Sequence, residues 1–196
     1  MENSPVFFYN INKTIDTGGI PMVALQIADI RSFMKKLLLT DSFDRFLFLE
    51  GSITTFNTFH IDGTLQKSYY TREEQDLLGE RSLSLWEELR PFCLNLIKGR
   101  KTPLSFRFTF QLSASNVEKL LAQTGITIPV DQVRGLLINL HYDGRSLRCT
   151  TGISLSVFTM DKKLDHAWDD MVQKYFRQQG IPYTTSSAAT LSHCSG

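Results

Sequence analysis

The stretch Phe43–Gly63 constrains the fold more than any other part of this sequence. Its apolar run Phe46–Leu49 is too short for a helix, and it ends at Glu50-Gly51, a pair typical of turns. Short apolar runs between turn residues indicate strands that are covered on both faces. We therefore expect a buried strand at 46–49 and a tight turn at Glu50-Gly51.

The residues after this turn predict two further strands. Ile53–Ile61 alternates between two sets of side chains and is rich in β-branched and aromatic residues, as a pleated strand requires. Asp62-Gly63 then predicts a hairpin turn, because a type I′ turn needs positive φ values that this dipeptide tolerates. With Thr64–Tyr70 as the return strand, the stretch predicts a three-stranded antiparallel meander.

Two parts of the chain share one order of expected elements. Met22–Tyr70 and Pro103–Thr159 each indicate a strand, a helix and three antiparallel strands. In the second part Pro103–Leu112 alternates apolar and polar residues, and Asp143-Gly144 repeats the acid–glycine turn signal. Neither half buries its apolar sheet face alone. We therefore expect an α+β fold in which two β-α-β-β-β halves with antiparallel meanders pack around one core and a pseudo-twofold axis.

The remaining segments extend this single domain at both ends and in the middle. The expected parts are a leader at 1–21, a single α+β domain at 22–183 with halves 22–70 and 103–159, a helical insert at 71–99, a C-terminal helix at 162–179 and a disordered tail at 184–196. The leader either precedes a true start at Met22 or is a disordered N-terminus.

Composition favours a cytoplasmic protein without a global affinity for polyanions. The chain carries 21 basic and 20 acidic residues, a net charge of +1, so any basic surface must be local. Its three cysteines, Cys93, Cys149 and Cys194, are scattered and odd in number, which argues against a disulfide framework. No apolar run approaches the roughly 18 residues of a membrane span, and no secretory signal is visible.

Local basic clusters give the first candidate binding site. The candidate residues are Arg31, Lys35 and Lys36 on the first helix, and Lys98, Arg100 and Lys101 at the end of a later helix. Cations at a helix end offset the helix dipole, which is a sufficient structural explanation. Alternatively the second cluster binds phosphate, with Arg107, Arg145 and Arg148 on the expected strands adding contacts.

A polar pocket between the two halves is the second candidate site, formed by Asn57, His60 and His141. Each histidine lies shortly before an Asp-Gly pair, so a pseudo-twofold axis would bring the two together. Two histidines bind a metal when they are close, but exposed strand histidines are the simpler explanation, and we expect no metal. No zinc, P-loop or dinucleotide motif is present, and we expect no cofactor.

The doubled β-α-β-β-β pattern resembles one domain of the DNA sliding clamps. That resemblance implies a protein that turns basic helix faces towards DNA. Arg31, Lys35 and Lys36 would take this role in the first helix, and the second helix offers Lys119 beside Glu118.

Whole segments of the sequence are similar to an uncharacterised family from anaerobic gut bacteria, described only as a domain of unknown function. The segments are SITTFNTFHIDG, ERSLSLWEELRPFCLNLIKGRKTPLSFRFTFQLS and CTTGISLSVFT, and the similarity spans Met22 to about Tyr183. It implies no activity and no site residues. The sequence as a whole favours a non-catalytic cytosolic module that binds a protein or nucleic acid. The alternative is an enzyme with a polar site between the halves.

Overall fold

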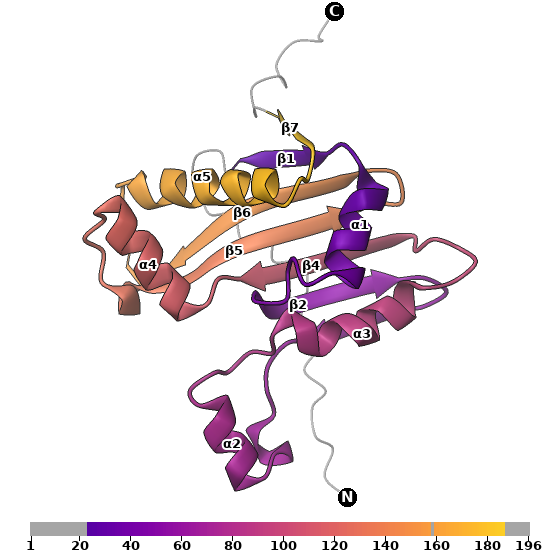
Figure 1. Ribbon diagram of the computed structural model, residues 1–196, viewed down its shortest axis with the longest axis horizontal. Coiled ribbons are helices and arrows are strands. Elements are labelled where there is room, and N and C mark those ends of the chain that lie inside the picture. Colours follow the sequence, from indigo (N-terminus) through magenta and orange to yellow (C-terminus); the bar gives the residue numbers. More distant parts are fainter. Residues whose placement is uncertain (1–22, 158, 187–196) are drawn as a thin grey trace, which may run out of the picture.

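Seven strands form one antiparallel sheet in a computed structural model that describes residues 23–157 and 159–186 (Figure 1). The strand order across the sheet is β3-β2-β4-β5-β6-β1-β7. The strands are β1 (Ala24–Ile27), β2 (Leu47–Thr54), β3 (Thr58–Asp62), β4 (Ser105–Gln111), β5 (Val133–Tyr142), β6 (Leu147–Leu155) and β7 (Tyr183–Ser186). Strands β4, β5 and β6 lie at the centre of the sheet, and the short strands β3 and β7 form its edges.

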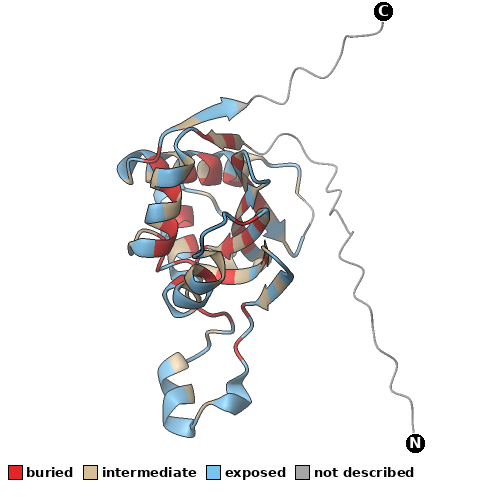
Figure 2. Cartoon of the chain, turned by 90° about the vertical axis from the view of Figure 1, so that its right-hand side faces the viewer, coloured by how far each residue is buried: buried red, intermediate tan, exposed pale blue. Residues whose placement is uncertain are grey.

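Helices cover one face of this sheet. The helices are α1 (Ile30–Leu39), α2 (Arg72–Leu78), α3 (Trp86–Ile97), α4 (Ala114–Thr124) and α5 (Lys163–Gln178), with short 3-10 helices at Lys67–Tyr69 and Val130–Gln132. Helices α1, α3, α4 and α5 lie over the sheet, whereas α2 stands away from it on an arm (Figure 1). No residue of α2 is buried, and Figure 2 shows the arm as an exposed extension of the body.

The core between sheet and helices is built largely from aromatic rings. Phe106, Phe108 and Phe110 of β4 are at most 1% exposed. Trp86 of α3 is fully buried, stacks on Phe48 with 5.4 Å between ring centroids, and donates its indole N–H to the carbonyl oxygen of Leu37 over 2.7 Å. Because the burial of one large apolar side chain contributes roughly 1.5–3 kcal/mol, these rings hold α1 and α3 on the sheet.

The predicted α+β class is confirmed, and each half has the order strand, helix, strand, strand: β1-α1-β2-β3 and β4-α4-β5-β6. The strand pairing of the two halves differs, however. Strand β4 pairs with β2 and with β5 of its own half, whereas β1 pairs with β6 and β7. One sheet therefore places β1 away from β2 and β3, so the pairing does not repeat around a twofold axis.

The acid–glycine pairs of the first half do not form the predicted turns. Gly51 lies inside β2, where an added Cβ would be 2.6 Å from the Phe108 ring and 2.7 Å from the Phe48 ring. At Gly63 a Cβ would be 1.8 Å from the Phe48 carbonyl oxygen. Both glycines serve close packing, and the turn between β2 and β3 is at residues 55–57 instead. The predicted turn at Asp143-Gly144 is confirmed, with Gly144 at a φ of 90°.

Two further predicted elements change, and one lies close to its predicted bounds. The expected return strand at 64–70 is an isolated bridge at Thr64 followed by a 3-10 helix. The C-terminal helix runs from 163 to 178, close to its predicted bounds. The first residues of the predicted tail, which begins at 184, belong to β7, because this strand pairs with β1. The predicted leader at 1–21 and the rest of the tail lie outside the described residues.

Candidate functional site

Strand alternation gives the sheet a polar face that none of the described helices covers; we call it the open face. On β4 the phenylalanines face the helices, so Arg107, Thr109 and Gln111 face the opposite side. The same alternation places Asn139 and His141 of β5 on this open face. The hydroxyl of Thr109 donates to the side-chain oxygen of Asn139 over 3.1 Å, which confirms that the two side chains meet across the strands.

Two arginines flank a histidine in one cross-strand row of the open face. Arg107 pairs with His141, and His141 pairs with Arg148 of β6. All three side chains are exposed. The row continues on the other side of Arg107 through Ser52 to His60 of β3. Directly paired residues on neighbouring strands have Cα atoms roughly 5 Å apart, so Arg107, His141 and Arg148 form one compact group.

Three connections gather at the end of the sheet next to this row. They are the β2–β3 turn, the α3–β4 loop at 98–104 and the β5–β6 turn at 143–146, which lie towards the right of Figure 1. The backbone N–H of Leu104 donates to the Thr54 carbonyl oxygen over 2.8 Å. A Cβ at Gly144 would be 2.9 Å from the Leu104 carbonyl oxygen. The 98–104 loop therefore touches both hairpins. We call residues 55–60, 98–107 and 141–148 the basic end.

The basic end concentrates positive charge in a nearly neutral chain. It contains six basic residues, Lys98, Arg100, Lys101, Arg107, Arg145 and Arg148, and one acidic residue, Asp143. All six basic side chains are exposed. Within 23–157 and 159–186, the ion pairs involve other cations: Arg81, Arg90, Lys162 and Lys163. None of the six cations of the basic end therefore forms an ion pair with another described residue.

The one carboxylate of the basic end is occupied by its own turn. Asp143 accepts hydrogen bonds from the backbone N–H groups of Arg145 and Ser146, at 2.9 and 2.7 Å, and from the Ser146 hydroxyl at 2.8 Å. These bonds lower the pKa of Asp143 to about 2. Asp143 therefore orders the turn and does not pair with the neighbouring arginines.

Two exposed apolar side chains accompany these charges. Phe56, in the β2–β3 turn, is 85% exposed, and Leu104 is 65% exposed. The Phe56 ring packs edge-on against Phe59 with 5.7 Å between centroids. Phe59 pairs with the buried Ile53, so the Phe56 ring lies towards the helix-covered side of the basic end. Exposed aromatic rings together with cations are what proteins use to stack the bases of single-stranded nucleic acids.

The pKa of His141 is lowered from its ordinary value, first by partial burial and then by the charges of Arg107 and Arg148, while Asp143 acts in the opposite direction. The neutral imidazole is therefore favoured between the two arginines at neutral pH. An anion bound over the row would offset the arginine charges and favour the protonated form.

The structure brings some of the predicted site residues together and separates others. Lys98, Arg100 and Lys101 lie in the basic end, which also contains Arg107 and Arg148. Arg31, Lys35 and Lys36 lie on α1, which belongs to the helix layer on the covered side of the sheet (Figure 1). The two predicted basic clusters therefore do not form one surface.

The predicted pocket residues share the open side of the sheet without enclosing a pocket. Asn57 lies in the β2–β3 turn, and His60 and His141 lie in one row. Strands β3 and β5 are separated by β2 and β4, so the two histidines are about 14 Å apart at the usual strand spacing. Among the described residues no group of three or more His, Cys, Asp or Glu side chains could hold a metal ion.

Two features of the basic end were missed from sequence. The alternation of Ile53–Ile61 predicts a strand through Phe56, because the alternation continues through the turn at 55–57. Asn57, a residue common in turns, was the available signal. The alignment of Arg107, His141 and Arg148 depends on the register between three strands, which the sequence does not carry.

The described thiols are unsuited to nucleophilic chemistry. Cys93 of α3 and Cys149 of β6 are free and fully buried. Burial raises the pKa of Cys93 to about 12 and raises the pKa of Cys149 further. Because the thiolate is the reactive form, both thiols are unreactive, and both residues pack in the core.

The fold and the site together define an α+β protein whose antiparallel sheet carries helices on one face and exposed cations at one end, of which Arg107 and Arg148 lie on the other face. Residues 36–184 match DUF5721, a family of unknown function, and the chain belongs to that family. No curated protein and no solved structure matches the chain. Within the described part of the chain, none of the helices has the length and apolar character needed to cross a membrane.

Proposed function

We propose that this protein is a non-catalytic cytosolic binding module that holds single-stranded nucleic acid at the basic end. One observation carries the proposal: six exposed cations and the exposed Phe56 gather on three adjoining connections and one strand row, in a chain with a net charge of +1. Contacts to phosphates contribute affinity that does not depend on the base sequence of the nucleic acid. An aromatic ring can stack on any base.

The shape of the surface favours a flexible single strand. The cations are spread over the row on the open face and over the loops that border it, so a chain of phosphates would follow the sheet from β6 towards the 98–104 loop. Phe56 lies on the neighbouring turn, within the same basic end. The buried free thiols Cys93 and Cys149 support a reducing compartment such as the cytosol.

Fluorescence anisotropy with a labelled oligo-dT tests the proposal, using the full chain over a range of salt concentrations. We expect the logarithm of the association constant to fall linearly with the logarithm of the salt concentration. The variant Arg107→Gln with Arg148→Gln is expected to lower the slope by about 1.4, because each phosphate contact to a single strand contributes about 0.7. Phe56→Ala is expected to weaken binding by roughly 1–3 kcal/mol with little change in slope.

A matched control removes two cations elsewhere. Arg45 and Lys119 are exposed on the helix-covered side, in the α1–β2 loop and in α4. Arg45→Gln with Lys119→Gln changes the net charge equally and is expected to leave oligo-dT binding unchanged. Equal losses in both double variants would show a non-specific charge effect, and no salt-dependent binding by the native chain would refute the proposal.

A further inference from the structure

A cavity of about 490 Å³ opens on the helix-covered side of the molecule. It lies between the loop at 41–46, α4 and α5, near the end of the sheet where β2 begins and β4 ends. The basic end is at the opposite end of these strands. The volume is within the range of cavities that bind small organic molecules, roughly 300–1,000 Å³.

Helical periodicity presents two sets of side chains to this cavity. Asn116, Lys119, Leu120 and Gln123 of α4 follow the i, i+3, i+4, i+7 spacing of one helix face, and Tyr175 comes from α5. The α4 face therefore turns both apolar and polar groups towards the same space.

The floor of the cavity is apolar. Phe46, Leu112 and Leu120 line it and are each at most 7% exposed. The ring of Tyr175 lies 5.5 Å from the ring of Phe46, centroid to centroid, and extends this surface. An apolar portion of a ligand would be removed from water here, which contributes about 25 cal/mol for each Å² buried.

Two cations from different walls flank the opening. Arg45 comes from the loop and Lys119 from α4, and both are exposed. Neither belongs to an ion pair with another described residue. Asp41 is the one acidic residue among the lining side chains. The charge at the opening therefore favours an anionic group.

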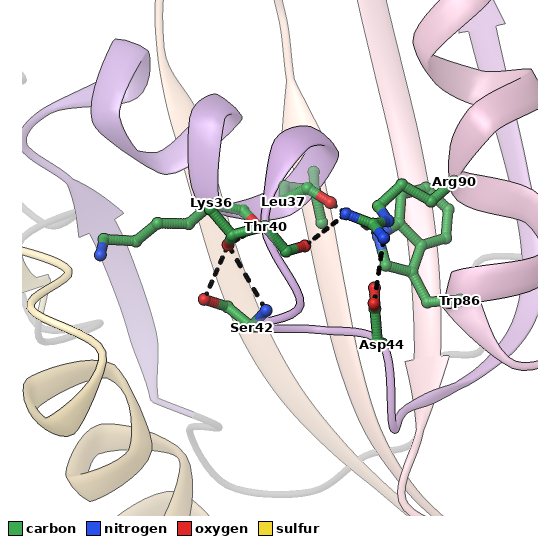
Figure 3. A network of polar contacts seen from close by, with 7 residues as sticks. All are labelled: Lys36, Leu37, Thr40, Ser42, Asp44, Trp86 and Arg90. Carbon is green, nitrogen blue, oxygen red and sulfur yellow. Dashed lines mark hydrogen bonds and ion pairs between the residues drawn. The ribbon is translucent and has the colours of Figure 1, made fainter.

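The loop wall is held in place before any ligand binds (Figure 3). Arg90 of α3 donates to the Thr40 carbonyl oxygen over 2.7 Å and to the Asp44 carboxylate over 3.1 Å. Ser42 donates its hydroxyl to the side-chain oxygen of Gln179 over 2.9 Å, which ties the loop to the end of α5. A wall fixed at three points keeps the cavity open at little entropic cost to binding.

Tyr175 supplies a hydrogen-bond donor at this site. Burial, with smaller contributions from Asp41 and Asp44, raises the pKa of its phenol to about 12, so the hydroxyl stays protonated at neutral pH. Within the described chain its ring packs against the rings of Phe43, Phe46 and Phe176. Partly buried tyrosine hydroxyls usually find a partner, and a ligand oxygen would provide one.

We propose that this cavity binds a small organic anion: an apolar body on Phe46, Leu112 and Leu120, with a carboxylate or sulfonate group between Arg45 and Lys119. The site uses neither the residues nor the face of the proposed nucleic-acid surface, so the two proposals stand or fall separately.

A pair of fluorescent probes tests this site in the full chain. Anilinonaphthalene sulfonate has an aromatic body and one negative charge, and phenylnaphthylamine has the same body without the charge. We expect saturable binding of both, with the sulfonate bound at least tenfold more tightly. Arg45→Gln with Lys119→Gln is expected to abolish this preference and to leave the binding of phenylnaphthylamine within twofold of the native value.

Two further variants separate this cavity from other surfaces. Gln123, an exposed residue of α4 at the cavity, is replaced by Trp to fill the space, and both probes are expected to lose at least tenfold in affinity. Arg100→Gln with Lys101→Gln at the basic end changes the same charge and is expected to change neither probe. The proposal is overturned if the native chain binds neither probe saturably, or if sulfonate binding depends on Arg100 and Lys101 instead of Arg45 and Lys119.

Discussion

On β4, Phe106, Phe108 and Phe110 face the helices, and Arg107 and Thr109 between them face the open side. The phenylalanines are buried against the other rings of the core, whereas Arg107 is exposed and forms no ion pair with a described residue. Alternation along this one strand thus places core-packing side chains on one face and exposed polar side chains on the other. Core packing therefore restricts which residues can occupy the covered face. It places no such restriction on the exposed arginines of the open face.

The largest effect is expected when the loss of stability on replacing a core residue is compared with the loss on replacing a residue of the cross-strand row. Trp86→Ala removes a fully buried ring and its hydrogen bond to Leu37, so we expect a loss of about 3–5 kcal/mol in the free energy of unfolding. Arg107→Ala is expected to change the same quantity by less than about 0.5 kcal/mol. Urea unfolding followed by circular dichroism measures both. A loss for Arg107→Ala comparable to that of Trp86→Ala would show that the open face also carries stability.

A smaller effect is expected at Arg90, a cation whose position is determined by packing. Its side chain is 22% exposed and pairs with Asp44, whose side chain is 10% exposed. Burial raises the pKa of Asp44, and Arg90 opposes that shift. Arg90→Met leaves a buried carboxylate without its cation, and we expect a loss of about 2–3 kcal/mol in the free energy of unfolding at pH 7.

The pH dependence of this variant identifies the cause. Without Arg90 the pKa of Asp44 rises further above its unfolded value, so protonation stabilises the folded state and the loss shrinks as the pH falls towards 5. Asp44→Asn in the Arg90→Met background is expected to recover part of the loss at pH 7. Urea unfolding of the three chains at pH 5 and pH 7 gives the comparison. A loss that is equal at both pH values would mean that Arg90 acts through packing alone.

The element types were predictable because they depend on local patterns. The alternation of Pro103–Leu112 predicted β4 and its buried face, and the helix expected at 162–179 is α5, at 163–178. The pairing of strands was not predictable, since β1 reaches the sheet through contacts with β6 and β7 at the far end of the chain. Such contacts depend on the whole fold.

The two Asp-Gly pairs show where local patterns fail. Asp143-Gly144 forms the predicted turn, with a positive φ at Gly144. Asp62-Gly63 has the same sequence, but Gly63 is buried against the Phe48 backbone, where no other residue would fit. A glycine needed for close approach and a glycine needed for positive φ look alike in a sequence. The same limit applies to the candidate site. The sequence shows its cations, but the alignment of Arg107, His141 and Arg148 in one row follows from the register between the strands.

The smallest expected effect is the response of His141 to pH. Because its pKa is lowered in the folded chain, the folded state favours the neutral imidazole. This contribution to stability is present above the ordinary value of 6.5 and is lost as the pH falls through the lower, folded pKa. His141→Gln is therefore expected to be less acid-sensitive than the native chain between about pH 7 and pH 5.

Nucleic-acid binding is expected to reverse this shift. Phosphates over the row would offset the charges of Arg107 and Arg148, so the pKa of His141 should rise when oligo-dT binds, with uptake of protons. NMR titration of the imidazole C–H signals, assigned with His141→Gln, measures the pKa in the free and bound chains. His60 lies in the same row with Ser52 between it and Arg107, so its signal is the internal comparison. If the pKa of His141 is the same with and without oligo-dT, the phosphates do not lie over the row, and the open face would resemble the covered face in serving the fold alone.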